Sequence, residues 1–222
     1  MSATTVTLET LLKEIDDASS SEALIEAVEN LAHARFPSAV PNLIAALGYN
    51  NPGAAIAAVD GLIQLDEISV APLLDLLDNH NYGARAWAIR ALAGIGDPRG
   101  LEILLDTAAN DFALSVRRAA ARGLGTIQWD KLTPENQISG QNRCLDVLLI
   151  TAEDPEWVVR YAAIVGVQTL GVALIKTQPH LLPQVLEQLA QRLNQEPVLA
   201  VRARILVAQT HIQAHFLKSL SP

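Results

Sequence analysis

The sequence predicts an all-α protein, built as a solenoid of stacked helical hairpins that forms a single domain over residues 1–222. Two observations predict this class. One helix-length motif recurs along the chain, and half of the residues are hydrophobic while only 4% are aromatic. Most of the apolar content is therefore Ala, Leu, Ile and Val, and Ala and Leu in particular favour helices. A chain of this length can bury a substantial core.

The recurring motif is a twelve-residue window with a fixed apolar pattern. The five copies are AAIAAVDGLIQL from Ala54, ARAWAIRALAGI from Ala84, VRRAAARGLGTI from Val116, VRYAAIVGVQTL from Val159 and VRARILVAQTHI from Val201. Positions 1, 5, 8, 9 and 12 are apolar or Gly in nearly every copy, which places them on one face of a helix. The starts are 30, 32, 43 and 42 residues apart. Such periods are typical of HEAT-like repeats, so we expect about five to six hairpins in a right-handed superhelix.

Partner helices are expected between the windows, at residues 69–78, 98–110, 141–152 and 179–194. Gly96-Asp97-Pro98 is typical of a helix end followed by a new helix start. The polar stretch 129–140, WDKLTPENQISG, is rich in turn residues and is expected to be a loop inside the fourth hairpin.

Charge and cysteine content exclude several classes of function. The net charge of −8 argues against general nucleic-acid binding, which depends on clustered Lys and Arg. Residues 1–78 carry −10 and the remainder +2, so the two halves offer different surfaces to partners. Cys144 has no partner for an internal disulfide, which suits a reducing compartment. Without a signal peptide or a predicted transmembrane segment, the chain is expected to be cytosolic and to bind no membrane.

Sequence motifs for self-contained catalysis are missing. There is no Walker loop, no G-x-S-x-G elbow and no H-E-x-x-H, and GIGDPRG at 94–100 follows no strand. His211 and His215 share a helix face but lack an evident third ligand, so no metal site is predicted. Cys144 lies within a predicted helix, where a lone thiol is usually a small buried hydrophobe. A binding protein is therefore favoured over an independent enzyme.

An arginine column runs through the repeats, because position 2 of the last four windows is Arg85, Arg117, Arg160 and Arg202. One interpretation is structural, with each guanidinium bonded to loop carbonyls or to acidic groups of the preceding repeat. The other is functional. Six of the sixteen basic residues fall between residues 85 and 122, Arg118 among them, and guanidinium groups suit an anionic ligand or an acidic protein.

Polar and aromatic residues are densest at an inter-repeat turn, DNHNYGARAW at residues 78–87. His80 could transfer a proton near neutral pH, and Asp78 could accept N–H bonds, so these two are the catalytic candidates. Tyr82 and Trp87 could stack on a flat ligand, and Arg85 could bind its carboxylates. The alternative is an Asn-rich turn in which Trp87 fills a gap.

Residues 79–125 resemble the phycobilin lyases of the E/F type, especially their F-type subunits. NYGARAWAIRALAGIGDP and NDFALSVRRAAARG carry the resemblance, whereas D-P-R-x-L followed by V-R-x-A-A-A is common among HEAT-like proteins. The resemblance implies a heterodimer with an E-like subunit that attaches phycocyanobilin to a cysteine of the phycocyanin alpha subunit through a thioether bond, and can also remove it. Phycocyanobilin would be the transferred ligand, with no permanent cofactor.

The resemblance also implies a location and a limit on the chemistry. The compartment would be a cyanobacterial cytosol, with possible phycobilisome association. Where related lyase-isomerases carry N-H-C-Q-G-N, this chain has NHNYGA at residues 79–84, with Asn81 in place of the cysteine associated with isomerisation. The expected product is therefore unisomerised. Two alternatives remain open: a HEAT-repeat protein of phycobilisome degradation, and a scaffold that binds no pigment.

Overall fold

In the computed structural model, the described residues are 6–78 and 82–220, and their regular structure is entirely helical. The all-α class is confirmed. The described helices form six successive hairpins, α1/α2 to α11/α12, which agrees with the five to six that the repeat pattern predicts. The chain groups into two compact units, residues 1–95 and 96–222, and each is described by itself.

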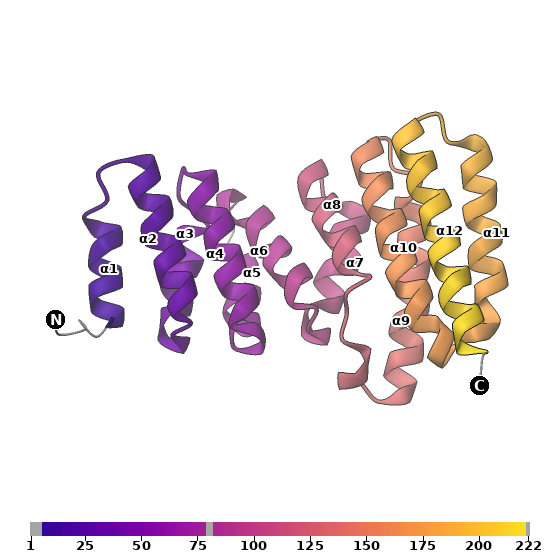
Figure 1. The fold of residues 1–222 in the computed structure, drawn as a ribbon, viewed down its shortest axis with the longest axis horizontal. Coiled ribbons are helices and arrows are strands. Elements are labelled where there is room, and N and C mark those ends of the chain that lie inside the picture. Colours follow the sequence, from indigo (N-terminus) through magenta and orange to yellow (C-terminus); the bar gives the residue numbers. More distant parts are fainter. Residues whose placement is uncertain (1–5, 79–81, 221–222) are drawn as a thin grey trace. The chain divides into compact units, whose positions relative to one another are not determined.

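Unit 1 contains the first three hairpins. Their helices are α1 (Leu8–Asp16), α2 (Ser21–Ala34), α3 (Val40–Ala46), α4 (Pro52–Gln64), α5 (Val70–Asp78) and α6 (Tyr82–Ile95). Short 3-10 turns at 37–39 and 66–69 lead into α3 and α5. The second helices of the hairpins pack in the order α2, α4, α6, and α1 lies beside α2 (Figure 1).

Unit 2 contains the other three hairpins. Their helices are α7 (Leu101–Asn110), α8 (Leu114–Gly123), α9 (Pro134–Thr151), α10 (Trp157–Thr177), α11 (Leu182–Gln195) and α12 (Leu199–Ser219). Helices α8, α10 and α12 pack side by side in that order, so α10 lies between the other two (Figure 1). This layer positions the surfaces described below.

The core follows the columns of the repeat. The small residues at position 5, Ala58, Ala88, Ala120 and Ala163, are all fully buried. In unit 2 the small residues let helices approach closely: a Cβ added at Gly166 of α10 would lie 2.5 Å from the carbonyl oxygen of Ala121 on α8. The window pattern therefore predicts both the helices and the faces by which they pack.

The predicted loop at residues 129–140 is wrong. Helix α9 begins at Pro134, because the Thr133 hydroxyl accepts from the Asn136 N–H and Pro134 occupies the first turn. A 3-10 turn precedes it, and its Trp129 is only 6% exposed and packs against Gly140 of α9. The residues that were interpreted as a loop are the cap and the first turns of a long helix.

Other boundaries agree with the sequence. Gly96 has a φ of +70°, and a Cβ there would meet the Thr126 carbonyl oxygen at 2.2 Å, so this turn requires glycine. Asp97 then accepts from the backbone N–H of Arg99 at 2.9 Å and starts the next turn. Helix α10 is long and apolar enough to span a membrane by composition, but it packs between α8 and α12 and on α9 as a core helix.

Candidate functional site

Arg117 joins two consecutive repeats of unit 2. Its Nη1 donates to the carbonyl oxygens of Asp111 and Phe112, in the turn before its own helix, at 2.8 and 3.1 Å. Its Nε and Nη2 form a fork on the carboxylate of Asp154, in the turn of the next repeat, at 2.7 and 3.2 Å. Hydrogen bonds from Arg117 to Asp154 raise the pKa of the guanidinium above its usual value.

Arg160 repeats this arrangement one hairpin later. Its Nη1 donates to the carbonyl oxygens of Asp154 and Pro155, and its Nε and Nη2 form a fork on Glu196 at 2.9 and 2.7 Å. Both side chains are buried, at 8% and 0% exposure. Burial by itself raises the pKa of the Glu196 carboxyl, but the bonds from Arg160 and the Val198 N–H outweigh it and leave that pKa below its usual value.

The structural interpretation of the arginine column is therefore observed for Arg117 and Arg160, with one correction. The carbonyls come from the turn before each arginine's own helix, and the acidic group belongs to the following repeat, not to the preceding one. Each acid also accepts the N–H two residues ahead, as Asp154 does from Glu156 at 2.8 Å. We call this unit, an arginine with the acid of the next repeat, a rung.

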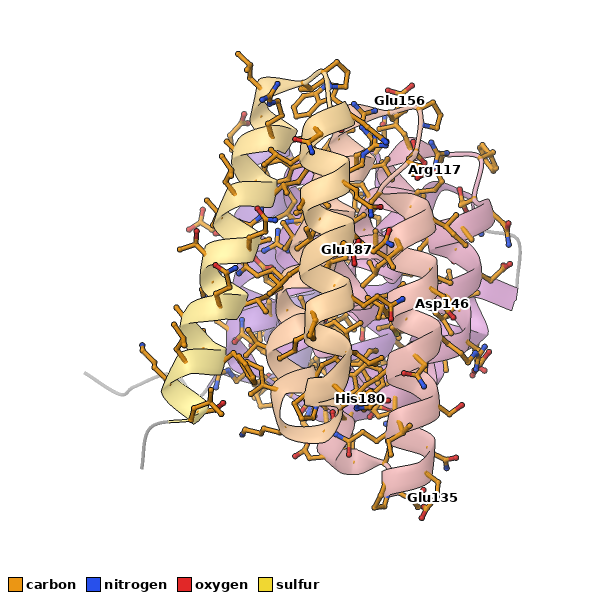
Figure 2. All side chains as sticks on the ribbon, turned by 90° about the vertical axis from the view of Figure 1, so that its right-hand side faces the viewer. Arg117, Glu135, Asp146, Glu156, His180 and Glu187 are labelled. Atoms are coloured by element: carbon orange, nitrogen blue, oxygen red, sulfur yellow. The ribbon has the colours of Figure 1, made fainter. Side chains whose placement is uncertain are left out.

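The rungs lie at one end of unit 2. In Figure 2, Arg117 and Glu156 are at the same end of the helices, whereas Glu135 and His180 are at the other. All four guanidinium bonds of Arg117 go to the protein itself. Its predicted role in ligand binding stays a prediction, and the contacts observed are those of a structural residue.

The other predicted site residues belong to two groups. Arg85 and Trp87 lie half-buried on α6 in unit 1, and the Arg90 guanidinium sits over the Trp87 ring, 5.7 Å from its centroid. His80 lies outside the described residues, and so do the side chains of Asp78 and Tyr82. The roles assigned to these residues stay predictions.

Arg118 is exposed and belongs to a surface of unit 2 that the sequence had not assembled. The aligned first residues of α8, α10 and α12 are Leu114, Trp157 and Leu199, and they are 43%, 45% and 79% exposed. One turn further along, Arg118 of α8 aligns with Tyr161 of α10, which is 38% exposed. Because the three helices lie side by side, equivalent positions are neighbours.

We call this surface the amphipathic face. Its members are Leu114, Arg118, Arg122, Trp157, Tyr161 and Leu199. Its two aromatic residues come from α10, and its two arginines come from α8, which packs against α10. The rings offer flat apolar area, and the guanidinium groups offer donors to carboxylates. The face thus has the chemistry to hold a flat, mostly apolar molecule that carries acidic groups.

The aromatic members were missed because the repeat was aligned on its buried columns. Trp157 lies two residues before the fourth window, and Tyr161 is the third residue of that window, a position that varies from copy to copy. The signal that could have found Tyr161 is the column directly after the arginine column, which also contains Arg118; Trp157 precedes the window and had no such signal. Exposure identifies that column, because the flanking apolar positions are buried.

The single thiol cannot act as a nucleophile in this fold. Cys144 is fully buried in α9, and burial raises its pKa to about 12. It is the small buried hydrophobe that the sequence indicates. His211 and His215 stack in α12 with ring centroids 4.4 Å apart, and no set of three potential metal ligands occurs among residues 6–78 and 82–220.

Comparison with known proteins decides the family. The chain is 54% identical over 207 residues to phycocyanobilin lyase subunit beta of Pseudanabaena tenuis, covering 93% of this chain and 73% of that one. It is 49% identical over 205 residues to phycocyanin alpha phycocyanobilin lyase CpcF of Synechocystis, covering 92% and 94%. The chain belongs to the phycocyanobilin lyase beta-subunit family. This family is the F type that the motifs at residues 79–125 resemble.

Solved structures agree with the assignment of this chain to the F-type family. The complex of CpcE and CpcF of phycocyanin lyase from Nostoc contains a chain 49% identical to it, with a TM-score of 0.71 over 78% of this chain and 98% of that one. A designed armadillo repeat protein, 15% identical with a TM-score of 0.53, shows the likeness of fold alone. A family model of HEAT repeats matches residues 66–125 of the F-type subunit.

Proposed function

We propose that the protein is one subunit of a heterodimeric phycobilin lyase, which attaches phycocyanobilin to a cysteine of the phycocyanin alpha subunit by a thioether bond and can also remove it. The observation that carries this proposal is identity of about one half, over more than nine tenths of the chain, to lyase subunits with this substrate in their names. The matched complex of CpcE and CpcF supports an E-like subunit as the partner.

The amphipathic face gives the proposal a physical basis. Phycocyanobilin is a flat open-chain tetrapyrrole with two propionates, so Tyr161 and Trp157 can cover its rings while Arg118 and Arg122 bind its carboxylates. Bilin and acceptor thiol then meet in a restricted geometry, which converts a slow and unselective addition into a directed one. The lyase acts by positioning, and the nucleophilic sulfur is that of the acceptor.

The only thiol of this chain takes no part in the transfer. Cys144 is buried, and burial raises its pKa to about 12, which argues against a bilin thioether on this subunit. Phycocyanobilin passes through as a transferred ligand, without a permanent cofactor. Because Asn81 stands where related lyase-isomerases have a cysteine, we infer that the thiol adds to the bilin without any further shift of its double bonds, so the attached pigment is unisomerised.

The partners and compartment follow from the same proposal. They are an E-like subunit, the phycocyanin alpha subunit and phycocyanobilin, in the cytosol of a cyanobacterium and near the phycobilisome. An overall charge of −8 and scattered arginines fit an acidic ligand at one face better than a nucleic acid.

Reconstitution tests the function directly. Purified chain, a purified E-like subunit, phycocyanobilin and apo-phycocyanin alpha subunit are mixed, and covalent pigment on the acceptor is measured after denaturation. We expect a product with the absorbance of unisomerised phycocyanobilin that requires both subunits. Equal attachment without this chain would contradict the proposal, and pigment removal alone would favour a role in phycobilisome degradation.

A further inference from the structure

The rungs of unit 2 follow a rule that connects each repeat to the next. Arg117 binds Asp154, and Arg160 binds Glu196, in both cases through a two-nitrogen fork on the carboxylate. Each acid lies three residues before the first residue of the second helix of the following hairpin, α10 or α12. In both rungs, the arginine at position 2 pairs with an acid in the turn of the next hairpin.

Arg202 on α12 is the last arginine of the column, and its rung is open. Its side chain is exposed, and no hydrogen bond or ion pair of that side chain is found within the part of the chain that the structure describes. The equivalent Arg160 is 7% exposed. Arg202 thus exposes a guanidinium group of the kind that, at the equivalent positions Arg117 and Arg160, binds a carboxylate.

The apolar columns on the same side of α12 are uncovered as well. At the sixth window position, Ala121 and Ile164 are 0% and 1% exposed, because the next helix covers them, whereas Leu206 is 51% exposed. Leu217 of α12 and Leu220, the residue that caps the C-terminal end of this helix, continue this exposure at 65% and 66%. On α10, by contrast, Gly171 packs against Ile212 of α12, so the following helix covers this side of α10.

We propose that this side of α12, formed by Arg202, Leu206, Leu217 and Leu220, is the docking surface for a HEAT-like hairpin of the E-like subunit. The hairpin continues the stack, its second helix covers the leucines, and an acidic residue in its turn receives the Arg202 fork. This inference rests on the proposed function for the identity of the partner. The rung chemistry comes from the chain itself.

A second copy of this chain does not have the complementary turn. The residues three positions before α2 and α4 are Ala18 and Tyr49, which have no carboxylate, whereas the equivalent residues before α10 and α12, Asp154 and Glu196, are acidic and bind arginine. The first hairpin of another copy would leave Arg202 without its acid. A different chain, with an acidic residue three positions before a helix, would pair with Arg202 and cover the exposed leucines of α12.

The test is binding of the purified E-like subunit to the full chain, measured by isothermal titration and by mass on size exclusion. We expect Leu206→Glu and Leu217→Glu each to weaken binding at least ~10-fold, since each places a charge in an apolar contact. Arg202→Glu should weaken it comparably, and Arg202→Lys should lose part of the affinity because Lys lacks the planar fork. Ile150→Glu on α9, where the side chain is 66% exposed, is the matched control and should bind as the unsubstituted chain does.

Circular dichroism melts of each variant separate loss of binding from loss of fold, and all four positions are exposed, so the melts should be unchanged. Unaltered binding by the Leu206 and Arg202 variants would overturn the docking surface while leaving the lyase proposal intact. Failure of the unsubstituted chain to bind any E-like subunit would overturn the proposed function itself. A chain that dimerises alone, and becomes monomeric with Leu206→Glu, would assign the surface to a second copy instead.

Discussion

At the scale of single residues, the same kind of ion pair occurs in two very different settings. Arg160 and Glu196 are buried, with 8% and 0% of their side chains exposed, whereas Arg143 and Glu102 pair on the surface at 50% and 71%. An exposed pair contributes about 0–1 kcal/mol, because water screens it. A buried pair that loses one partner leaves a charge without solvent or counter-ion.

We therefore expect Arg160→Ala to lower the free energy of unfolding by about 3–5 kcal/mol, and Arg143→Ala by less than about 1 kcal/mol. Urea denaturation followed by circular dichroism measures both. Similar losses in the two variants would show that the rung between α10 and α12 does not stabilise the stack.

Asp97 makes the free energy of unfolding depend on pH in the acidic range. Its side chain is 5% exposed, and hydrogen bonds from Arg99, chiefly from the side chain, hold the pKa of the carboxyl at about 2 against an ordinary 3.8. Because the folded pKa is lowered, this stabilisation is complete above about pH 4 and is lost as the pH falls through 2. Its full size is about 2 kcal/mol.

Asp97→Asn should remove this contribution. The difference in unfolding free energy between the two proteins is expected to be largest near pH 5–7 and to shrink by about 2 kcal/mol towards pH 2. Urea midpoints measured from pH 7 to pH 2 give the comparison. A difference that is independent of pH would contradict the role of the Arg99 bond.

At the scale of helices, α8 and α10 approach so closely that only glycine fits between them. A Cβ at Gly166 would lie 2.5 Å from the Ala121 carbonyl oxygen and 2.7 Å from a methyl of Leu148. Backbone cannot move aside as a flexible side chain can, so we expect Gly166→Ala to destabilise by about 1–3 kcal/mol despite the better helix propensity of Ala. The thermal midpoint measures the loss, and a gain would mean that the helices separate without cost.

The amphipathic face is also a property of packed helices, since Arg118 comes from α8 and Tyr161 from α10. We expect Arg118→Glu and Tyr161→Ala each to reduce the rate of bilin transfer about 10-fold or more, as a carboxylate contact or a stacked ring is lost. Both side chains are exposed, so the melting temperature should stay the same. Lys176→Glu, an exposed charge reversal near the far end of α10, is the control.

Arg117 is a poor probe of the same site. Its four hydrogen bonds join two repeats, so a lower transfer rate in an Arg117 variant would report damaged packing as readily as lost ligand contact. Transfer rates that are unaffected in the Arg118 and Tyr161 variants would leave Tyr82, Arg85 and Trp87 as the remaining candidates.

At the scale of the whole molecule, the sequence predicts one domain, and the contacts group into two compact units that meet at residues 95 and 96. In a Trp87→Phe variant, fluorescence reports only Trp129 and Trp157 of unit 2, whereas circular dichroism reports every helix. If the chain is one cooperative domain, the two urea transitions coincide. An earlier or later fluorescence transition would show that the units unfold separately.

The sequence by itself determined the repeat, the helical class and the buried columns, because the period of apolar residues reflects local helix geometry and needs no knowledge of neighbours. Its motifs also pointed to the family. The loop at residues 129–140 was misjudged because polar residues that cap a helix resemble those of a turn.

Tertiary structure alone decided what the arginines do. Arg117, Arg118 and Arg160 look alike in a sequence, yet one bridges repeats, one lies exposed and one is buried on Glu196. Which acid an arginine meets, and which ring stands beside it, depends on how hairpins about 40 residues apart stack against each other. The local sequence pattern predicts the helices, but only their packing determines which side chains come together on one surface.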